Sequence, residues 1–282
     1  MIAKLRALVC VVLAGLAIPQ VVSADSDAAD QETGNEQHLE YLVKRQQAYT
    51  LERVSDERIA VLQTSPLFRW DNPISGARGG VFLWTIDERP VAMTKCHVND
   101  RKQHYVESSV FLSDSLLLKY QDQTIWRPKE SALKHVSVER DSSPVQSSVG
   151  RLVQMRQLAA DFAIEDTWGE GDGEPYQLRL IPRPLYRYAS KEAGLLDGAV
   201  FAFVQGTNPE AVVIVEAIRR NNQVQWHCGI SRLTGYALTV ERNGNVVYKV
   251  PKLNHPDHQN SYRHYWEKPI PYPFQSEKTS GE

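Results

Sequence analysis

The feature that most restricts the fold is a set of similar strings that occurs twice along the chain. Residues 66–70, with the sequence PLFRW, correspond to residues 184–188, with the sequence PLYRY. Each string is followed by a glycine-led apolar segment, at residues 81–84 in the first case and 200–203 in the second. A shared order of this kind rarely arises by chance, and repeated segments usually correspond to structural units. The sequence therefore predicts an internal duplication.

The repeated segments have the composition of β-strands. Asn243 and Gly244 lie between the apolar segments 238–240 and 246–248. This pattern predicts a hairpin with a type I′ turn, because both turn residues need a positive φ angle. One helix is predicted before the strands of each half, because apolar residues recur there at helical spacing. These residues are Leu39, Leu42 and Tyr49 in the first half and Leu152, Met155 and Phe162 in the second.

We therefore predict an α+β fold of two tandem modules, each a helix followed by an antiparallel β-meander. The boundaries follow changes in composition, such as the polar linker that contains Ser142, Ser143 and Pro144. In chain order the predicted segments are a signal peptide at 1–24, a flexible leader at 25–37, the first module at 38–141, the linker at 142–148, the second module at 149–251 and an extended proline-rich tail at 252–282.

The N-terminus has the pattern of a secretory signal. Lys4 and Arg6 supply a positive region, residues 7–18 form an apolar core, and Ala24 is a small residue at the cleavage point. The alternative is a membrane anchor, but spanning a bilayer takes roughly 20 apolar residues and this core is shorter. We therefore expect an exported protein, periplasmic or extracellular, with no membrane span after cleavage.

Composition excludes other classes of protein. The chain has 282 residues, of which 42% are hydrophobic and 23% charged, with a formal net charge of -2. These values are typical of a globular protein and argue against a disordered or coiled-coil chain. A protein that binds nucleic acid by bulk electrostatics needs a net basic face. We therefore expect no nucleic-acid partner.

Whether the cysteines are expected to form a disulfide depends on whether the chain is exported. Cys10 lies in the signal, which leaves Cys96 and Cys228 in the mature protein. Thiols in an oxidising compartment often pair. The alternative is that each is buried separately as a small apolar side chain. The sequence leaves both alternatives open, because it does not give the distance between the two residues.

Catalytic and cofactor motifs are scarce. The chain contains no GxGxxG after a strand, no P-loop, no HExxH and no CxxC. We therefore expect no cofactor. The segment with His255, Asp257 and His258 offers three donor side chains that zinc accepts. It lies in the proline-rich tail, however, and a solvated polar tail is the simpler interpretation.

The matched strings also concentrate aromatic and arginine side chains. Large residues at matched positions of related sheets usually fill the core. The functional alternative is a cleft of aromatic and arginine side chains between the two halves, where ligand sites often form. The candidate ligand-binding residues are Arg69, Trp70, Trp84, Tyr186, Arg187 and Tyr188.

Three stretches of the chain resemble an uncharacterised family of exported proteins associated with planctomycete-type bacteria. The first joins residues 68–73 (FRWDNP) to 79–85 (GGVFLWT), and the second is residues 151–156 (RLVQMR). The third joins residues 178–188 (LRLIPRPLYRY) to 197–207 (DGAVFAFVQGT). The resemblance implies export and covers most of the chain from about residue 49 onward. It implies no activity and no catalytic residue.

These observations favour a non-catalytic function. We predict an exported binding or interaction protein of the bacterial cell envelope, whose partner is a small ligand or an envelope protein. The alternative is an exported hydrolase, assisted by a metal ion at His255, Asp257 and His258. A third interpretation is a structural component of the envelope without a small ligand. Catalytic groups can come from distant parts of a chain, so the sequence leaves the hydrolase open.

Overall fold

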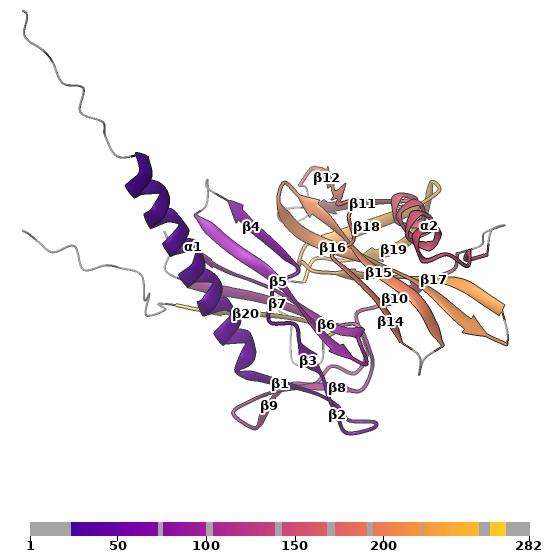
Figure 1. The fold of residues 1–282 in the computed structure, drawn as a ribbon, viewed down its shortest axis with the longest axis horizontal. Coiled ribbons are helices and arrows are strands. Elements are labelled where there is room, and N and C mark those ends of the chain that lie inside the picture. Colours follow the sequence, from indigo (N-terminus) through magenta and orange to yellow (C-terminus); the bar gives the residue numbers. More distant parts are fainter. Residues whose placement is uncertain are drawn as a thin grey trace, which may run out of the picture.

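The computed structural model describes residues 24–72, 76–99, 104–138, 143–167, 173–190, 194–221, 223–253 and 260–268. Within these ranges the chain forms two helices and twenty strands (Figure 1). The helices are α1 (Ala24–Gln47) and α2 (Ser148–Ala160). The strands before α2 are β1 (Tyr49–Arg53), β2 (Arg58–Ile59), β3 (Val61–Leu62), β4 (Phe68–Asn72), β5 (Ala77–Ile86), β6 (Arg89–Asn99), β7 (His104–Phe111), β8 (Leu116–Tyr120), β9 (Gln123–Trp126) and β10 (Lys134–Val136).

The strands after α2 are β11 (Phe162–Thr167), β12 (Pro175–Gln177), β13 (Arg179–Leu180), β14 (Tyr186–Ser190), β15 (Leu195–Gln205), β16 (Asn208–Arg220), β17 (Gln223–Arg232), β18 (Ala237–Arg242), β19 (Asn245–Val250) and β20 (Tyr262–Glu267). We refer to residues 24–138 as the first half of the chain and to residues 143–268 as the second half.

The hairpin predicted at Asn243 and Gly244 is confirmed: it joins β18 to β19, with φ angles of 51° and 77°.

The strands form four antiparallel sheets. The first large sheet has the order β20-β7-β6-β5-β3, and β4 also pairs with β5. The second large sheet has the order β10-β17-β16-β15-β13, and β14 also pairs with β15. The first small sheet is β2-β1-β8-β9 and the second is β12-β11-β18-β19. The two large sheets thus share one arrangement, and so do the two small sheets.

Each half of the chain contributes its last strand to the large sheet of the other half. β20 pairs with β7, with Tyr262 opposite Val110. β10 pairs with β17, with Lys134 opposite Ile230. Neither large sheet is therefore complete without residues from both halves. The exchange ties the two halves together through backbone hydrogen bonds as well as through side-chain packing.

The predicted α+β class and the tandem helix-plus-meander modules are wrong. The described residues are mostly antiparallel β-sheet, with α1 and α2 as the helices among them. The strands of each half are also divided between a large and a small sheet, so no meander follows the chain from one end to the other. The exchange of β10 and β20 breaks the independence that separate modules would need.

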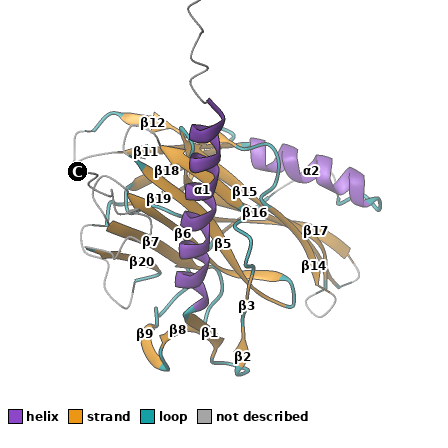
Figure 2. Cartoon of the chain, turned by 60° about the vertical axis from the view of Figure 1, so that its left-hand side comes forward, coloured by secondary structure: helices purple, strands orange, loops and turns teal. Residues whose placement is uncertain are grey.

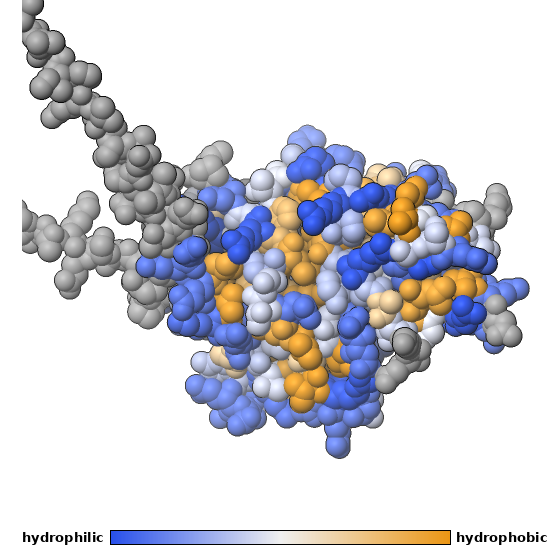
Figure 3. Space-filling view, in the orientation of Figure 1, coloured by the Kyte–Doolittle hydropathy of each residue, from blue (hydrophilic) through white to orange (hydrophobic). Residues whose placement is uncertain are grey.

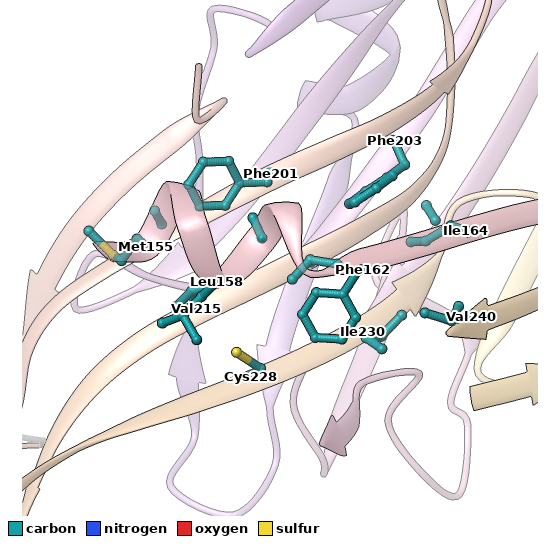
Figure 4. Close-up of a cluster of buried hydrophobic side chains, with 14 of the residues drawn as sticks. Met155, Leu158, Phe162, Ile164, Phe201, Phe203, Val215, Cys228, Ile230 and Val240 are labelled. Atoms are coloured by element: carbon teal, nitrogen blue, oxygen red, sulfur yellow. The ribbon is translucent and has the colours of Figure 1, made fainter. Parts of the chain in front are cut away.

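The large sheets lie face to face in the middle of the molecule, with a helix on each outer side (Figures 1 and 2). Side chains of both sheets share one core between them, including Val81, Leu83 and Met93 from the first and Val200 and Val212 from the second. On the outer faces, α1 packs on the first large sheet and α2 on the second. Figure 4 shows Met155 and Leu158 of α2 beside Phe201 and Val215 of the sheet.

This layering explains why the middle of the central strand β5 is apolar at consecutive positions. In β5, Val81 and Leu83 enter the core between the large sheets. Phe82 packs beneath α1, and Trp84 packs against the first small sheet. Successive side chains of a strand point to opposite faces, so a strand that is buried on both faces has no polar alternation.

The ends of the chain differ from the sequence-based expectations. Residues 25–37, expected as a flexible leader, belong to α1. Tyr262–Glu267, expected within an extended tail, form β20. Residues 1–23 of the predicted signal peptide lie outside the described residues, which begin with Ala24, the first residue of α1. Among the described residues, neither helix has the length and apolar character that crossing a bilayer requires.

The surface shown in Figure 3 is largely hydrophilic, with hydrophobic residues between the polar ones. Several exposed apolar side chains belong to short strands or to α2, such as Val61 of β3 and Val149 of α2. Single exposed apolar residues are ordinary on a protein surface. The features that point to function lie between the large sheets.

Candidate functional site

Two rows of side chains occupy matched positions in the large sheets. In the second large sheet, Tyr188 of β14 lies opposite Gly198 of β15, which lies opposite Glu216 of β16. In the first large sheet, Trp70 of β4 lies opposite Gly79 of β5, which lies opposite His97 of β6. Each row is an aromatic residue, a glycine and a polar residue on three neighbouring strands.

The glycine in each row makes room for the aromatic ring. A Cβ atom on Gly198 would lie 2.6 Å from Tyr188 Cζ, and one on Gly79 would lie 2.6 Å from Trp70 Cε2. The ring can therefore lie across the central strand and reach the third one. Tyr188 donates a hydrogen bond of 2.9 Å from its hydroxyl to Glu216 Oε1. The Trp70 and His97 ring centroids are 5.1 Å apart.

The first cavity, which we call the arginine pocket, is built around Glu216. Arg89 of β6 donates to both carboxylate oxygens of Glu216, at 2.9 and 2.7 Å. The residue Glu216 is 5% exposed, so its charge is withdrawn from water and compensated by two partners from different strands. Burial and the negative charge of Glu216 raise the pKa of Tyr188 well above its usual value. Tyr188 therefore stays protonated and keeps donating to Glu216.

Two further arginines reach the arginine pocket from the first small sheet. Arg53 of β1 forms a bidentate pair with Asp56, at 2.8 and 2.5 Å, and Arg58 of β2 pairs with Asp87. The side chain of Asp56 is 39% exposed and that of Asp87 is 35% exposed. The cavity has a volume of about 360 Å³ and lies between the two halves of the chain.

The second cavity, which we call the lysine pocket, lies at the other end of β6 and has a volume of about 390 Å³. Lys95 of β6 donates from Nζ to the carbonyl oxygen of Pro209, at 2.8 Å, and to Glu210 Oε2, at 3.3 Å. Asn208 donates from Nδ2 to Glu210 Oε1. Burial and nearby positive charges, Lys95 first among them, lower the pKa of His97 to about 3. His97 is therefore neutral beside the lysine.

Acceptor atoms in and next to the lysine pocket are not all satisfied. Asp166 of β11 is fully buried, yet neither carboxylate oxygen has a hydrogen-bond partner. Burial and the charge of Glu210 raise the pKa of Asp166 to about 6, although Lys95 opposes the shift. Asn208 Oδ1 is likewise buried without a partner. Unsatisfied buried acceptors are uncommon and call for an explanation.

A chain of hydroxyl groups lies on another wall of the lysine pocket. Tyr262 of β20 donates to Ser108 Oγ of β7 at 2.8 Å. Ser108 Oγ lies 3.3 Å from Nδ1 of His264, which is also on β20. Burial and the nearby charge of Lys95 lower the pKa of His264, which keeps the ring neutral near pH 7. This contact exists because β20 crosses to the sheet of the first half.

The six predicted ligand-binding residues are divided among several places. Tyr188 lines the arginine pocket, and Tyr186 stacks on it with ring centroids 5.5 Å apart. Arg187 is paired with Asp197 at 2.7 Å. Trp84 is buried in the core between the first large and first small sheets. The remaining pair, Arg69 and Trp70, lines a smaller cavity of about 240 Å³ beside α1.

The predicted metal and disulfide residues have different outcomes. His255, Asp257 and His258 lie outside the described residues. Across the described part of the chain, no group of three or more His, Cys, Asp or Glu side chains could hold a metal ion. Cys96 and Cys228 are both buried, in separate hydrophobic clusters, and no disulfide joins them. The structure thus shows the alternative in which each cysteine is buried separately.

Sequence analysis missed the charged residues that define both pockets. Lys95 lies in the apolar strand β6, and Glu210 and Glu216 lie in the apolar strand β16. A charge within an apolar strand is a signal, because such residues are rarely buried unless they are paired. That signal identifies the residues but not their partners, which lie in other strands.

Comparison of the chain with protein-family models, curated proteins and solved structures finds no match.

Proposed function

We propose that the protein is an exported, non-catalytic binding protein of the bacterial cell envelope, and that the arginine pocket binds a small organic acid. One observation carries the proposal: guanidinium groups from β1, β2 and β6 meet at one cavity between the two halves. Guanidinium groups bind carboxylates through paired, directional hydrogen bonds. The volume of about 360 Å³ falls among small-molecule pockets, which span about 300–1,000 Å³.

The arginines have different roles in this proposal. Arg89 is committed to the buried Glu216 and forms the floor of the pocket with Tyr188. Arg53 and Arg58 pair with partly exposed aspartates, and surface pairs of this kind contribute little to stability because water screens them. A ligand carboxylate can therefore replace Asp56 or Asp87 at low cost. The ligand gains charged hydrogen bonds while the floor stays intact.

Thermal unfolding of the purified protein with defined acids tests the proposal. We would use citrate, D-glucuronate and inorganic phosphate, with D-glucose as the uncharged counterpart of glucuronate. A ligand at 100 times its dissociation constant adds about 2.7 kcal/mol when it binds only the folded state. We expect at least one acid to raise the unfolding temperature, and glucose to have no effect.

The Arg58→Gln variant assigns that shift to the pocket. We expect the shift to be reduced in Arg58→Gln, because the variant removes a charged hydrogen bond to the ligand. Arg156→Gln, an exposed arginine of α2, is the matched control and should retain the full shift. The proposal fails if no acid stabilises the protein, or if both variants respond equally.

A hydrolase is the second candidate, and the contact between Ser108 and His264 is the observation that favours it. A neutral histidine next to a serine hydroxyl is the arrangement that activates a serine nucleophile. Ser108 is only 6% exposed, which restricts access to a substrate. A fluorophosphonate probe tests this candidate: labelling that disappears in Ser108→Ala would support a hydrolase, and absence of labelling would exclude a reactive Ser108.

A further inference from the structure

The lysine pocket places three reactive groups side by side. Lys95 Nζ is 3.3 Å from Glu210 Oε2, and the carboxamide of Asn208 is hydrogen-bonded to Glu210 Oε1. Glu210 therefore bridges an amine and an amide. Lys95 also donates to the carbonyl oxygen of Pro209, the residue between the other two. Asn208 and Glu210 are two positions apart on β16, and their hydrogen bond shows that the two side chains lie side by side.

The surroundings of the three groups exclude much of the water. The Lys95 side chain is 8% exposed and that of Glu210 is 1% exposed. Burial penalises charge, so an amine and a carboxylate in such surroundings depend on each other as partners. Transfer of a proton from Lys95 Nζ to Glu210 leaves an uncharged amine, which is a nucleophile.

The unsatisfied oxygen of Asn208 fits the same chemistry. Oδ1 is buried without a partner, whereas Nδ2 contacts Glu210. The oxygen and nitrogen of a carboxamide are interchangeable by a half-turn of the group. After such a turn, a protonated Glu210 donates to Oδ1. That hydrogen bond satisfies the orphan oxygen and polarises the amide carbonyl toward attack.

We propose that Lys95 and Asn208 form an intramolecular amide cross-link, with Glu210 as the proton carrier. Lys95 Nζ passes a proton to Glu210 and attacks Cγ of Asn208, so that a C–N bond forms. The bond between Cγ and Nδ2 then breaks. Glu210 returns its proton to the leaving nitrogen, which also takes up the second proton of Nζ and departs as ammonium, so that the protein loses the mass of one ammonia. No oxidant, reductant or other reactant is consumed.

The cross-link has a consequence for the fold. β6 belongs to the first large sheet and β16 to the second, so the new bond joins the two sheets covalently. The same two strands carry Arg89 and Glu216, which form the floor of the arginine pocket. The cross-link therefore holds the two walls of that pocket at a constant separation. This role does not depend on what the arginine pocket binds.

Intact mass spectrometry tests the cross-link. Folded protein is incubated until its mass is constant, and the mass is compared with that of the sequence after N-terminal processing. We expect a product lighter by one ammonia, and a branched tryptic product that joins the peptides of Lys95 and Asn208. The proposal is overturned if the Lys95 peptide is recovered only in linear form, or if the ammonia is lost elsewhere.

Variants then assign the roles. We expect neither Lys95→Arg nor Glu210→Gln to lose ammonia, since the first lacks a nucleophilic amine and the second lacks a proton carrier. The matched control is Lys119→Arg, because Lys119 also contacts a glutamate, Glu52, at 2.6 Å. It should still lose ammonia. Cross-linking that persists in Glu210→Gln would contradict the role of Glu210, whereas the mass and the peptides of the wild type decide whether the cross-link exists.

Discussion

β6 and β16 are joined by two buried ion pairs, and the two pairs differ in how well their polar atoms are satisfied. Arg89 at the start of β6 pairs with Glu216 late in β16, whereas Lys95 late in β6 pairs with Glu210 near the start of β16. Glu216 has a bidentate arginine and a tyrosine hydroxyl, so its buried charge is well compensated. Around Glu210 the acceptors of Asp166 and Asn208 lack partners. The comparison shows that one arrangement of strands supports a stable floor at one end and a reactive cluster at the other.

Removal of Glu216 should have the largest effect on stability. Glu216→Ala leaves Arg89 and Tyr188 without their acceptor, and breaking a buried pair costs about 3–5 kcal/mol. Urea denaturation followed by circular dichroism measures the loss. Glu241→Ala on β18 is the control, because Glu241 is exposed and such changes stay within about 0.5 kcal/mol. Similar losses in the two variants would contradict the structural role of Glu216.

The glycines test whether the two rows are built alike. Gly79→Ala and Gly198→Ala each place a Cβ within 2.6 Å of a ring atom, and overpacking of this kind costs about 1–3 kcal/mol. We expect Gly79→Ala to cost more, because its Cβ also lies 2.6 Å from the backbone oxygen of Cys96. Chemical denaturation of both variants measures the difference. A stable Gly79→Ala protein would show that Trp70 does not lie across β5.

Asp166 should give the lysine pocket a pH dependence. The pKa of Asp166 rises from 3.8 to about 6 on folding, so its protonated form favours the folded state. That contribution is complete below the unfolded pKa and is lost as the pH rises through about 6. Asp166→Asn should therefore stabilise the protein by about 1–3 kcal/mol near pH 7.5, and the gain should shrink toward pH 4. The free energies of unfolding of the wild type and of Asp166→Asn, measured across this pH range, test the prediction. A stabilisation that is independent of pH would rule out titration of Asp166.

The smallest effect on stability is expected at the mouth of the arginine pocket. Arg58→Gln removes a partly exposed ion pair with Asp87, so we expect a change within about 0.5 kcal/mol in the absence of ligand. The same chemical denaturation experiment measures it. A loss as large as that of Glu216→Ala would mean that Arg58 is structural and is not available to a ligand.

The sequence predicted local features better than the assembly of the sheets. The turn at Asn243 and Gly244 was predictable because its conformation depends on two residues. The exchange of β10 was not predictable, since Lys134–Val136 is short and two of its three residues are exposed. An apolar strand such as β15 shows that both faces are buried, but not which sheets cover them. The α+β prediction failed for this reason.

The candidate sites were predictable only in part. Tyr188 belongs to a matched string and does line the arginine pocket. Arg58, Arg89 and Glu216 come from three strands that the sequence does not connect. Their meeting depends on the face-to-face packing of the large sheets. Charge within an apolar strand was the available signal, and it marks Glu216 and Lys95 equally, although the two have different surroundings.

Calorimetric titration of citrate, D-glucuronate and inorganic phosphate into three proteins tests the central claim, that the arginine pocket is the ligand site. The proteins are the wild type, Arg58→Gln and the control Arg156→Gln, which changes an exposed arginine of α2. We predict that at least one acid binds the wild type, that it binds Arg58→Gln about tenfold or more weakly, and that it binds Arg156→Gln with unchanged affinity, since loss of a charged hydrogen bond costs at least 1.4 kcal/mol. Equal weakening in the two variants, or no binding to the wild type, would contradict the claim.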